Sequence, residues 1–197
     1  MSTPAADERT LRVLGARRRE PPEPSSGELV RRLRQATQED PSLVALFDAE
    51  AIAGERHLLS AWAHLGRSRR TGASRLRDRG AELALYVAGD DQLGRALAKV
   101  GVAASTEAFV LVAEKPRTLP ELLDRFGLQE DPSAYPRPPT VATLERLGVP
   151  PTERAMVPES AWEGLVLERV ALVDLSSPST GGAPPRAESA SSPRRKG

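Results

Sequence analysis

Histidine is the side chain that most often moves protons or binds metals at neutral pH, and the sequence contains only His57 and His64. On one helix, residues seven apart lie about 10 Å apart along the axis, which is too far for one shared metal ion. An HExxH zinc site needs histidines four residues apart, and Glu55 precedes His57 in the wrong arrangement. We therefore expect His57 to be a hydrogen-bonded structural or surface histidine.

The sequence also lacks the other common catalytic patterns. It has no cysteine, which excludes a disulfide, a thiolate metal site and a cysteine nucleophile. It has no GxxxxGK[ST], GxGxxG or GxSxG motif, and the segment 89–94 places two acids where a phosphate would need bare backbone donors. Asp90 and Asp91 instead suit the start of a helix. We predict no catalytic residue, no metal and no other cofactor, and we expect that the protein is not an enzyme.

Arginine dominates the positive charge, with 25 arginines, three lysines and a formal net charge of +1. Six arginines fall between positions 67 and 79, where Asp78 is the one acid: Arg67, Arg69, Arg70, Arg75, Arg77 and Arg79. Such a segment can neutralise several phosphates and bind RNA without reading its bases. The alternative is a solvated surface loop. An aromatic content of 4% leaves no stacking platform for single-stranded RNA.

The 197 residues suffice for one substantial hydrophobic core. The longest apolar runs, 83–88 and 108–113, are much shorter than the ~18 residues that a membrane span needs. The first residues lack the apolar segment of a secretory signal. We therefore expect a cytoplasmic protein with no membrane partner.

Hydrophobic periodicity predicts alternating strands and helices. The expected strands are 11–16, 42–47, 81–88 and 107–113, with one buried helical turn as the alternative for 81–88. The expected helices are one that begins at Ser26, one from an Asp48 N-cap to Gly66, one from 89–91 to Val100, and later ones near 119–126, 141–147 and 159–175. A basic loop is expected from Arg67 to Arg79.

This order of elements implies an α/β fold with a small mixed sheet packed with helices and a C-terminal helix. We predict a flexible N-terminus over 1–9, a single domain over 10–175 and a tail over 176–197. The tail is rich in Pro, Ser and Arg and has no large apolar residue, so we expect it to be disordered.

Three blocks of the sequence resemble one family. They are DAEAIAGERHLLSAWAH at 48–64, ELALYVAGDDQLGRALAKVGV at 82–102 and VLERVALVDL at 166–175. The first two carry G-x-x-H-L-x-x-A and E-x-x-x-Y-x-x-G-x-x-Q-[IL]-x-x-A-x-x-x-x-G patterns. Together they resemble the KEOPS subunit family whose eukaryotic members are called PRPK-binding protein. The proline-rich stretch 131–139 and the tail depart from the family, and Leu93 stands where isoleucine is usual.

The resemblance implies a noncatalytic regulatory subunit that binds and activates a small atypical kinase/ATPase and helps to hold tRNA. It also implies that the kinase links this subunit indirectly to a metal-dependent transferase, which makes threonylcarbamoyl-adenosine next to the tRNA anticodon.

We assign predicted contact residues to both partners. The predicted tRNA contacts are Arg56, His57, Arg67, Arg69, Arg70, Arg75, Gln92 and Arg95. The predicted kinase contacts lie on an apolar helix surface and are Trp62, Leu65 and Trp162, although a core position is the alternative for each tryptophan. Two other functions stay open: a free-standing RNA-binding module that uses the arginine loop, and an enzyme that depends on His57.

Overall fold

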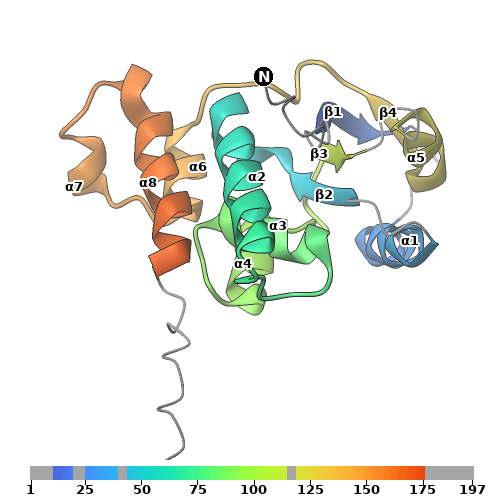
Figure 1. Cartoon of the computed structure of the whole chain (residues 1–197). Coiled ribbons are helices and arrows are strands. Elements are labelled where there is room, and N and C mark those ends of the chain that lie inside the picture. The colour runs from blue at the N-terminus through green and yellow to red at the C-terminus, as the bar shows by residue number, and fades with distance from the viewer. Residues whose placement is uncertain (1–10, 20–24, 40–43, 115–118, 176–197) are drawn as a thin grey trace, which may run out of the picture.

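A four-stranded sheet lies at the centre of the protein, with helices on both faces (Figure 1). The structure is a computed structural model that describes residues 11–19, 25–39, 44–114 and 119–175. Its strands are β1 (Arg12–Arg18), β2 (Val44–Asp48), β3 (Ala108–Ala113) and β4 (Leu128–Glu130). The predicted α/β class is confirmed.

The strands pair in the order β2-β3-β1-β4, and each pairing is antiparallel, so the expected mixed sheet is wrong in this respect. The connection β1–α1–β2 passes over β3, and the connection β3–α5–β4 passes over β1. Each helical crossover therefore leaves a gap one strand wide, and the strand that fills the gap runs the opposite way. The chain thus forms two interleaved split βαβ units.

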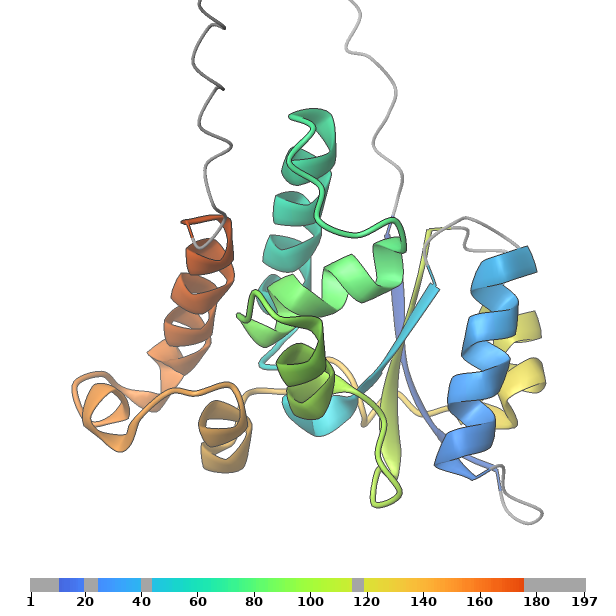
Figure 2. The same ribbon diagram turned by 90° about the horizontal axis from the view of Figure 1, so that it is seen from below.

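One face of the sheet is covered by α1 (Ser26–Glu39) and α5 (Leu119–Phe126). Leu29 of α1 and Phe126 of α5 are fully buried in the same cluster as Phe109 and Leu111 of β3. Alternate side chains of a strand point to opposite faces, so this cluster uses one face of the sheet only. Figure 2 shows α1 and α5 on one side of the strands and the remaining helices on the other.

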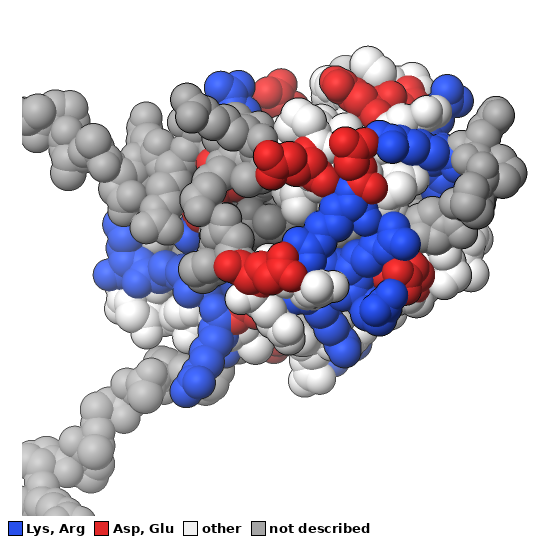
Figure 3. All heavy atoms as spheres, turned by 90° about the vertical axis from the view of Figure 1, so that its right-hand side faces the viewer, with Lys and Arg blue, Asp and Glu red and all other residues white. Residues whose placement is uncertain are grey.

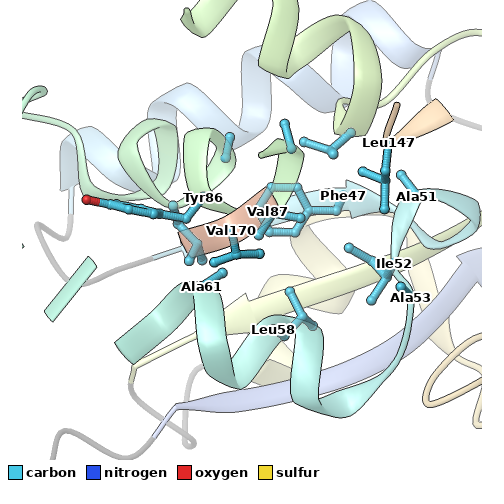
Figure 4. Close-up of a cluster of buried hydrophobic side chains, with 14 of the residues drawn as sticks. Phe47, Ala51, Ile52, Ala53, Leu58, Ala61, Tyr86, Val87, Leu147 and Val170 are labelled. Atoms are coloured by element: carbon cyan, nitrogen blue, oxygen red, sulfur yellow. The ribbon is translucent and has the colours of Figure 1, made fainter. Parts of the chain in front are cut away.

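The opposite face carries a larger helical layer with the main hydrophobic core. The layer contains α2 (Glu55–Arg70), α3 (Arg79–Ala88), α4 (Leu93–Val100), α6 (Val141–Arg146), α7 (Pro151–Arg154) and α8 (Trp162–Leu175). Figure 4 shows how Phe47, Leu58, Tyr86 and Val170 from four different elements meet in this core.

Residues 81–88 belong to helix α3 and do not form the predicted strand. Every residue from Glu82 to Ala88 is buried, so the helix shows no polar face and its apolar run resembles that of a buried strand. The ends of the helix identify it: the Asp78 carboxylate accepts from Ala81 N, and Gly89 closes the helix with φ 59° and ψ 37°.

Helix α2 also differs from its prediction at both ends. Asp48 caps a short 3₁₀ turn, Ala49–Ala51, and α2 begins at Glu55 after Gly54. Gly66 lies inside the helix, which continues to Arg70 and ends at Thr71. The first part of the expected basic loop is therefore helical.

The other predicted elements are found with small changes of boundary, whereas β4 and α7 were not predicted. The predicted flexible N-terminus 1–9 and tail 176–197 lie outside the described residues. Among the described residues, no helix combines the length and the apolar character needed to cross a bilayer.

Candidate functional site

His57 is a structural residue of the helical core. Its side chain is fully buried, its Nδ1 accepts from Ala53 N at 3.1 Å, and its Nε2 lies 2.9 Å from Val87 O. Because Nδ1 accepts an amide hydrogen, Nε2 carries the proton and donates to Val87. Burial lowers the pKa of His57 to about 4, against the opposing effect of the Val87 carbonyl. The predicted tRNA contact through this side chain is therefore wrong, because no RNA can reach it.

Helix α2 is tied to α8 at its first turn. Gly54 precedes the helix with φ 136° and offers no side chain as a cap, and His57 N donates instead to Glu163 Oε1 of α8 at 3.1 Å. A Cβ at position 54 would lie 2.6 Å from the same oxygen. The positive φ favours glycine here, whereas the carboxylate is the end of a flexible side chain and can move aside.

A buried carboxylate organises the arginine-rich segment. Glu82 is fully buried and accepts from Arg69 Nη2 at 2.7 Å, Ser74 Oγ at 2.8 Å and Arg75 N at 2.9 Å. Arg69 also donates to the carbonyl of Leu76. The segment 71–78 is therefore folded around Glu82, and part of its cationic charge is used inside the protein.

A second carboxylate joins three helices. Asp174 of α8 contacts His64 Nδ1 at 2.7 Å, Tyr86 Oη at 2.9 Å and Arg67 Nη1 at 3.3 Å. Close to it, Arg75 donates to the carbonyl of Val173. These contacts connect the end of α8 with α2 and α3.

The structure separates the predicted tRNA residues into side chains engaged inside the protein and side chains exposed on α2 and α4. The side chains of Arg69 and Arg75 are engaged inside the protein. Three others, Arg56, Arg67 and Arg70, are exposed at different points along α2, and two more, Gln92 and Arg95, lie exposed at the start of α4. Arg95 pairs with Asp90 and Asp91 at 2.9 Å.

The predicted kinase contacts lie mainly in the core. Leu65 is fully buried, so its predicted contact with a partner is wrong. Trp62 is half-buried, with the guanidinium of Arg79 5.5 Å from its ring. Trp162 is half-buried against the same core, and its Nε1 has no hydrogen-bond partner among the described residues. Both tryptophans pack against the core and keep part of their surface exposed, so their kinase contacts stay predictions.

Helix α8 has an exposed apolar face that the prediction did not identify. The helix buries Val166, Val170 and Val173, yet apolar residues occupy its other sides as well. Leu172 and Leu175 are 54% and 78% exposed, and Ala171 is exposed beside them. We call these three residues the α8 outer face. Glu168 is also exposed and lies one turn before Ala171 and Leu172 on this side, so the face is apolar only over the last turn of α8.

A polar cavity of about 530 Å³ lies where β1 ends and α1 begins. Its lining residues are Arg17, Arg18, Ser25, Ser26, Ala104, Ser105, Thr106 and Glu107. Arg18 donates to Thr106 O at 3.3 Å and to Ser26 Oγ at 3.0 Å, and its guanidinium lies over the ring of Phe109. Within the described ranges, His, Cys, Asp and Glu side chains form no group of three that could hold a metal ion.

Comparison with protein-family models and with curated protein sequences finds no match. The resemblance to the KEOPS subunit family therefore stays a prediction that rests on the three sequence blocks.

Proposed function

We propose that the protein is a noncatalytic, regulatory and tRNA-binding subunit of a cytoplasmic KEOPS complex, where it binds and activates the small atypical kinase/ATPase. The observation that carries this proposal is that the residues of the two sequence patterns make specific contacts in the helical layer. Gly54, His57 and Glu82 each make the specific contacts described above. Tyr86 donates to Asp174, and a Cβ at Gly89 would lie 2.8 Å from the Cβ of Arg169.

These positions support the resemblance more strongly than apolar positions would. An apolar residue in a core can be exchanged for another of similar size, so a match there says little. A glycine at positive φ and a buried, hydrogen-bonded histidine or glutamate are required by the geometry. The three blocks converge on α2, α3, α4 and α8, which form one layer of the structure.

The α8 outer face is the surface that we assign to the kinase. Stable protein interfaces centre on buried apolar anchors with charges at the rim, and Leu172 and Leu175 offer such anchors. The residues after α8, 176–197, contain no Leu, Ile, Val, Met, Phe, Tyr or Trp with which to cover them. A separate protein with a complementary apolar surface therefore fits this face better than the chain's own C-terminal residues.

The proposal is tested by co-purification with the small kinase/ATPase from the same organism. We expect the full chain to capture the kinase and the double variant Leu172→Glu/Leu175→Glu to lose it. The matched control is Leu97→Glu, which changes a leucine of similar exposure, 47%, on α4. All three proteins should melt at similar temperatures, because none of these changes adds a charge to the core.

Two results would contradict the proposal. Failure of the full chain to capture the kinase would do so, and RNA binding without the kinase would then favour a free-standing RNA-binding module. Steady ATP hydrolysis or acyl transfer by the highly purified protein would instead indicate an enzyme.

A further inference from the structure

Helix α1 presents a stripe of arginine and glutamine to solvent. Residues three, four and seven apart share one side of a helix, and the side of α1 opposite the buried Leu29 and Ala36 carries polar residues without an acid. These residues are Gly27, Arg31, Arg34, Gln35 and Gln38, and we call them the α1 stripe. Each is exposed, and the side chain of Arg31 is 72% exposed.

The acids of α1 lie to one side of the stripe. Glu28 pairs with Arg31 at 2.6 Å and with Arg32 at 2.7 Å, so one carboxylate is shared between two guanidinium groups. Glu39 pairs with Arg125 of α5 at 2.6 Å. These ion pairs fix the positions of Arg31, Arg32 and Arg125. An excess of positive charge is left along the helix.

Figure 3 faces the side of the molecule on which α1 and α5 lie. Lys and Arg side chains gather at the middle of this face, and Asp and Glu side chains lie around them. The polar cavity adjoins the stripe, because Ser25 and Ser26 at the start of α1 line it together with Arg17 and Arg18.

We propose that the α1 stripe, together with this cavity, binds the sugar-phosphate backbone of an RNA strand. The proposal rests on the RNA-binding half of the proposed function and places it at the opposite end of the molecule from α8 (Figure 1). The kinase and the RNA would then bind without competing for one surface.

The chemistry of the stripe favours nucleic acid over a protein partner. Guanidinium groups bind phosphate oxygens through two parallel hydrogen bonds, and glutamine amides donate to phosphate and sugar oxygens. The Gln35 amide already donates to Glu39 at 2.9 Å, so Gln38 is the glutamine that serves this role. The stripe has no large apolar residue to act as the buried anchor of a protein interface.

In the cavity the Ser26 hydroxyl already donates to Ala103 O and Glu107 adds one carboxylate, so Ser25 and Ser105 supply the hydroxyl groups for a ribose-phosphate group. The lining has no aromatic side chain on which a base could stack. Contact without base specificity is expected.

The experiment compares two double variants that remove the same charge at different places. Arg31→Gln/Arg34→Gln changes the α1 stripe, and Arg12→Gln/Arg77→Gln removes two exposed arginines that lie outside it, at the start of β1 and in the segment after α2. The probe is an unmodified tRNA transcript, and its dissociation constant is measured at several salt concentrations. All of these arginines are exposed, so both variants should fold, which circular dichroism verifies.

We expect the α1 variant to bind tRNA about tenfold more weakly and the other variant to bind like the natural chain. The slope of log affinity against log salt should become shallower by about 1 to 2 for the α1 variant only, because a complex with fewer phosphate contacts releases fewer counterions. Kinase capture by both variants should be unchanged.

Several outcomes would overturn the inference. Equal weakening of both variants would mean that net charge alone attracts RNA, and selective weakening of the control would place the RNA away from the α1 stripe. Equally tight binding of a polyglutamate peptide would indicate an acidic protein partner. Absence of tRNA binding by the natural chain would also overturn it, whereas the kinase half of the proposed function would be judged separately by kinase capture.

Discussion

Two arginine-rich regions of this protein use the same side chain in opposite ways. Between positions 67 and 79, Arg69 points inward to Glu82, a carboxylate with no exposed surface, at 2.7 Å. On α1, Arg31 points outward and shares Glu28 with Arg32 at the helix surface. The density of arginine does not distinguish the regions. They differ in whether a buried acceptor is within reach.

This difference has an energetic cause. A carboxylate removed from water must be surrounded by donors, and breaking such an arrangement leaves an uncompensated buried charge. A carboxylate at the surface keeps its water, so an arginine beside it adds little stability. The first region is therefore needed for the fold, and the second can serve binding.

The largest expected effect comes from removing the buried acceptor. Glu82→Ala leaves Arg69 and the hydroxyl of Ser74 without their shared partner, so we expect the free energy of unfolding to fall by about 3 to 5 kcal/mol. Urea unfolding measures it. Glu28→Ala on α1 is the matched control and should change the unfolding midpoint much less. Similar losses for both variants would refute the contrast between the regions.

A smaller effect on stability is expected from acid, and it tests another buried ionisable group of the helical layer. The pKa of His57 is lowered to about 4 in the folded chain from an ordinary 6.5, so the unfolded chain takes up a proton more readily between these values. Stability should therefore be complete above pH 6.5 and fall by about 2 to 3 kcal/mol as the pH drops to 4.

The contribution of His57 is isolated by comparison with His57→Gln, because carboxylates also titrate near pH 4. The variant should be less stable at pH 7, since two buried backbone groups lose a partner of the right shape, but its stability should fall less steeply with acid. His64→Gln retains His57 and should retain the steep fall. An unchanged slope in His57→Gln would show that His57 is not the group responsible.

The smallest effects are expected from single side chains at the edge of each region. Ser74→Ala removes a hydrogen bond to Glu82 and should cost about 1 kcal/mol of unfolding free energy. Arg31→Ala should leave the unfolding midpoint unchanged within error, because its pair with Glu28 is exposed. A larger loss for Arg31→Ala than for Ser74→Ala would mean that α1 depends on its surface ion pairs.

Much of the fold could be predicted from local patterns, with specific exceptions. β1, β3, α1, α5 and α8 follow the periodicity of their own residues. Helix α3 was mistaken for a strand because burial on every side removes the polar face by which a helix is recognised. The antiparallel sheet was also missed, since the direction of a strand depends on which distant strand lies beside it.

The candidate site could be predicted less well. The spacing of the two histidines excludes a shared metal site, but the contact of His57 with Val87 becomes visible only when α2 lies against α3. Leu65 and the leucines of α8 are equally apolar in the sequence, and packing alone decides that Leu65 is buried while Leu172 and Leu175 are exposed.

Residue types establish which chemistry is present: no thiol, two histidines and an excess of arginine over lysine. Neighbours within a few positions establish where most helices and strands lie. Which arginines reach solvent depends on the fold, because Arg69 meets Glu82 thirteen residues further along the chain and Arg75 meets the carbonyl of Val173 on α8. An arginine bonds to whichever acceptor lies beside it in the folded chain, and the local sequence does not specify that acceptor.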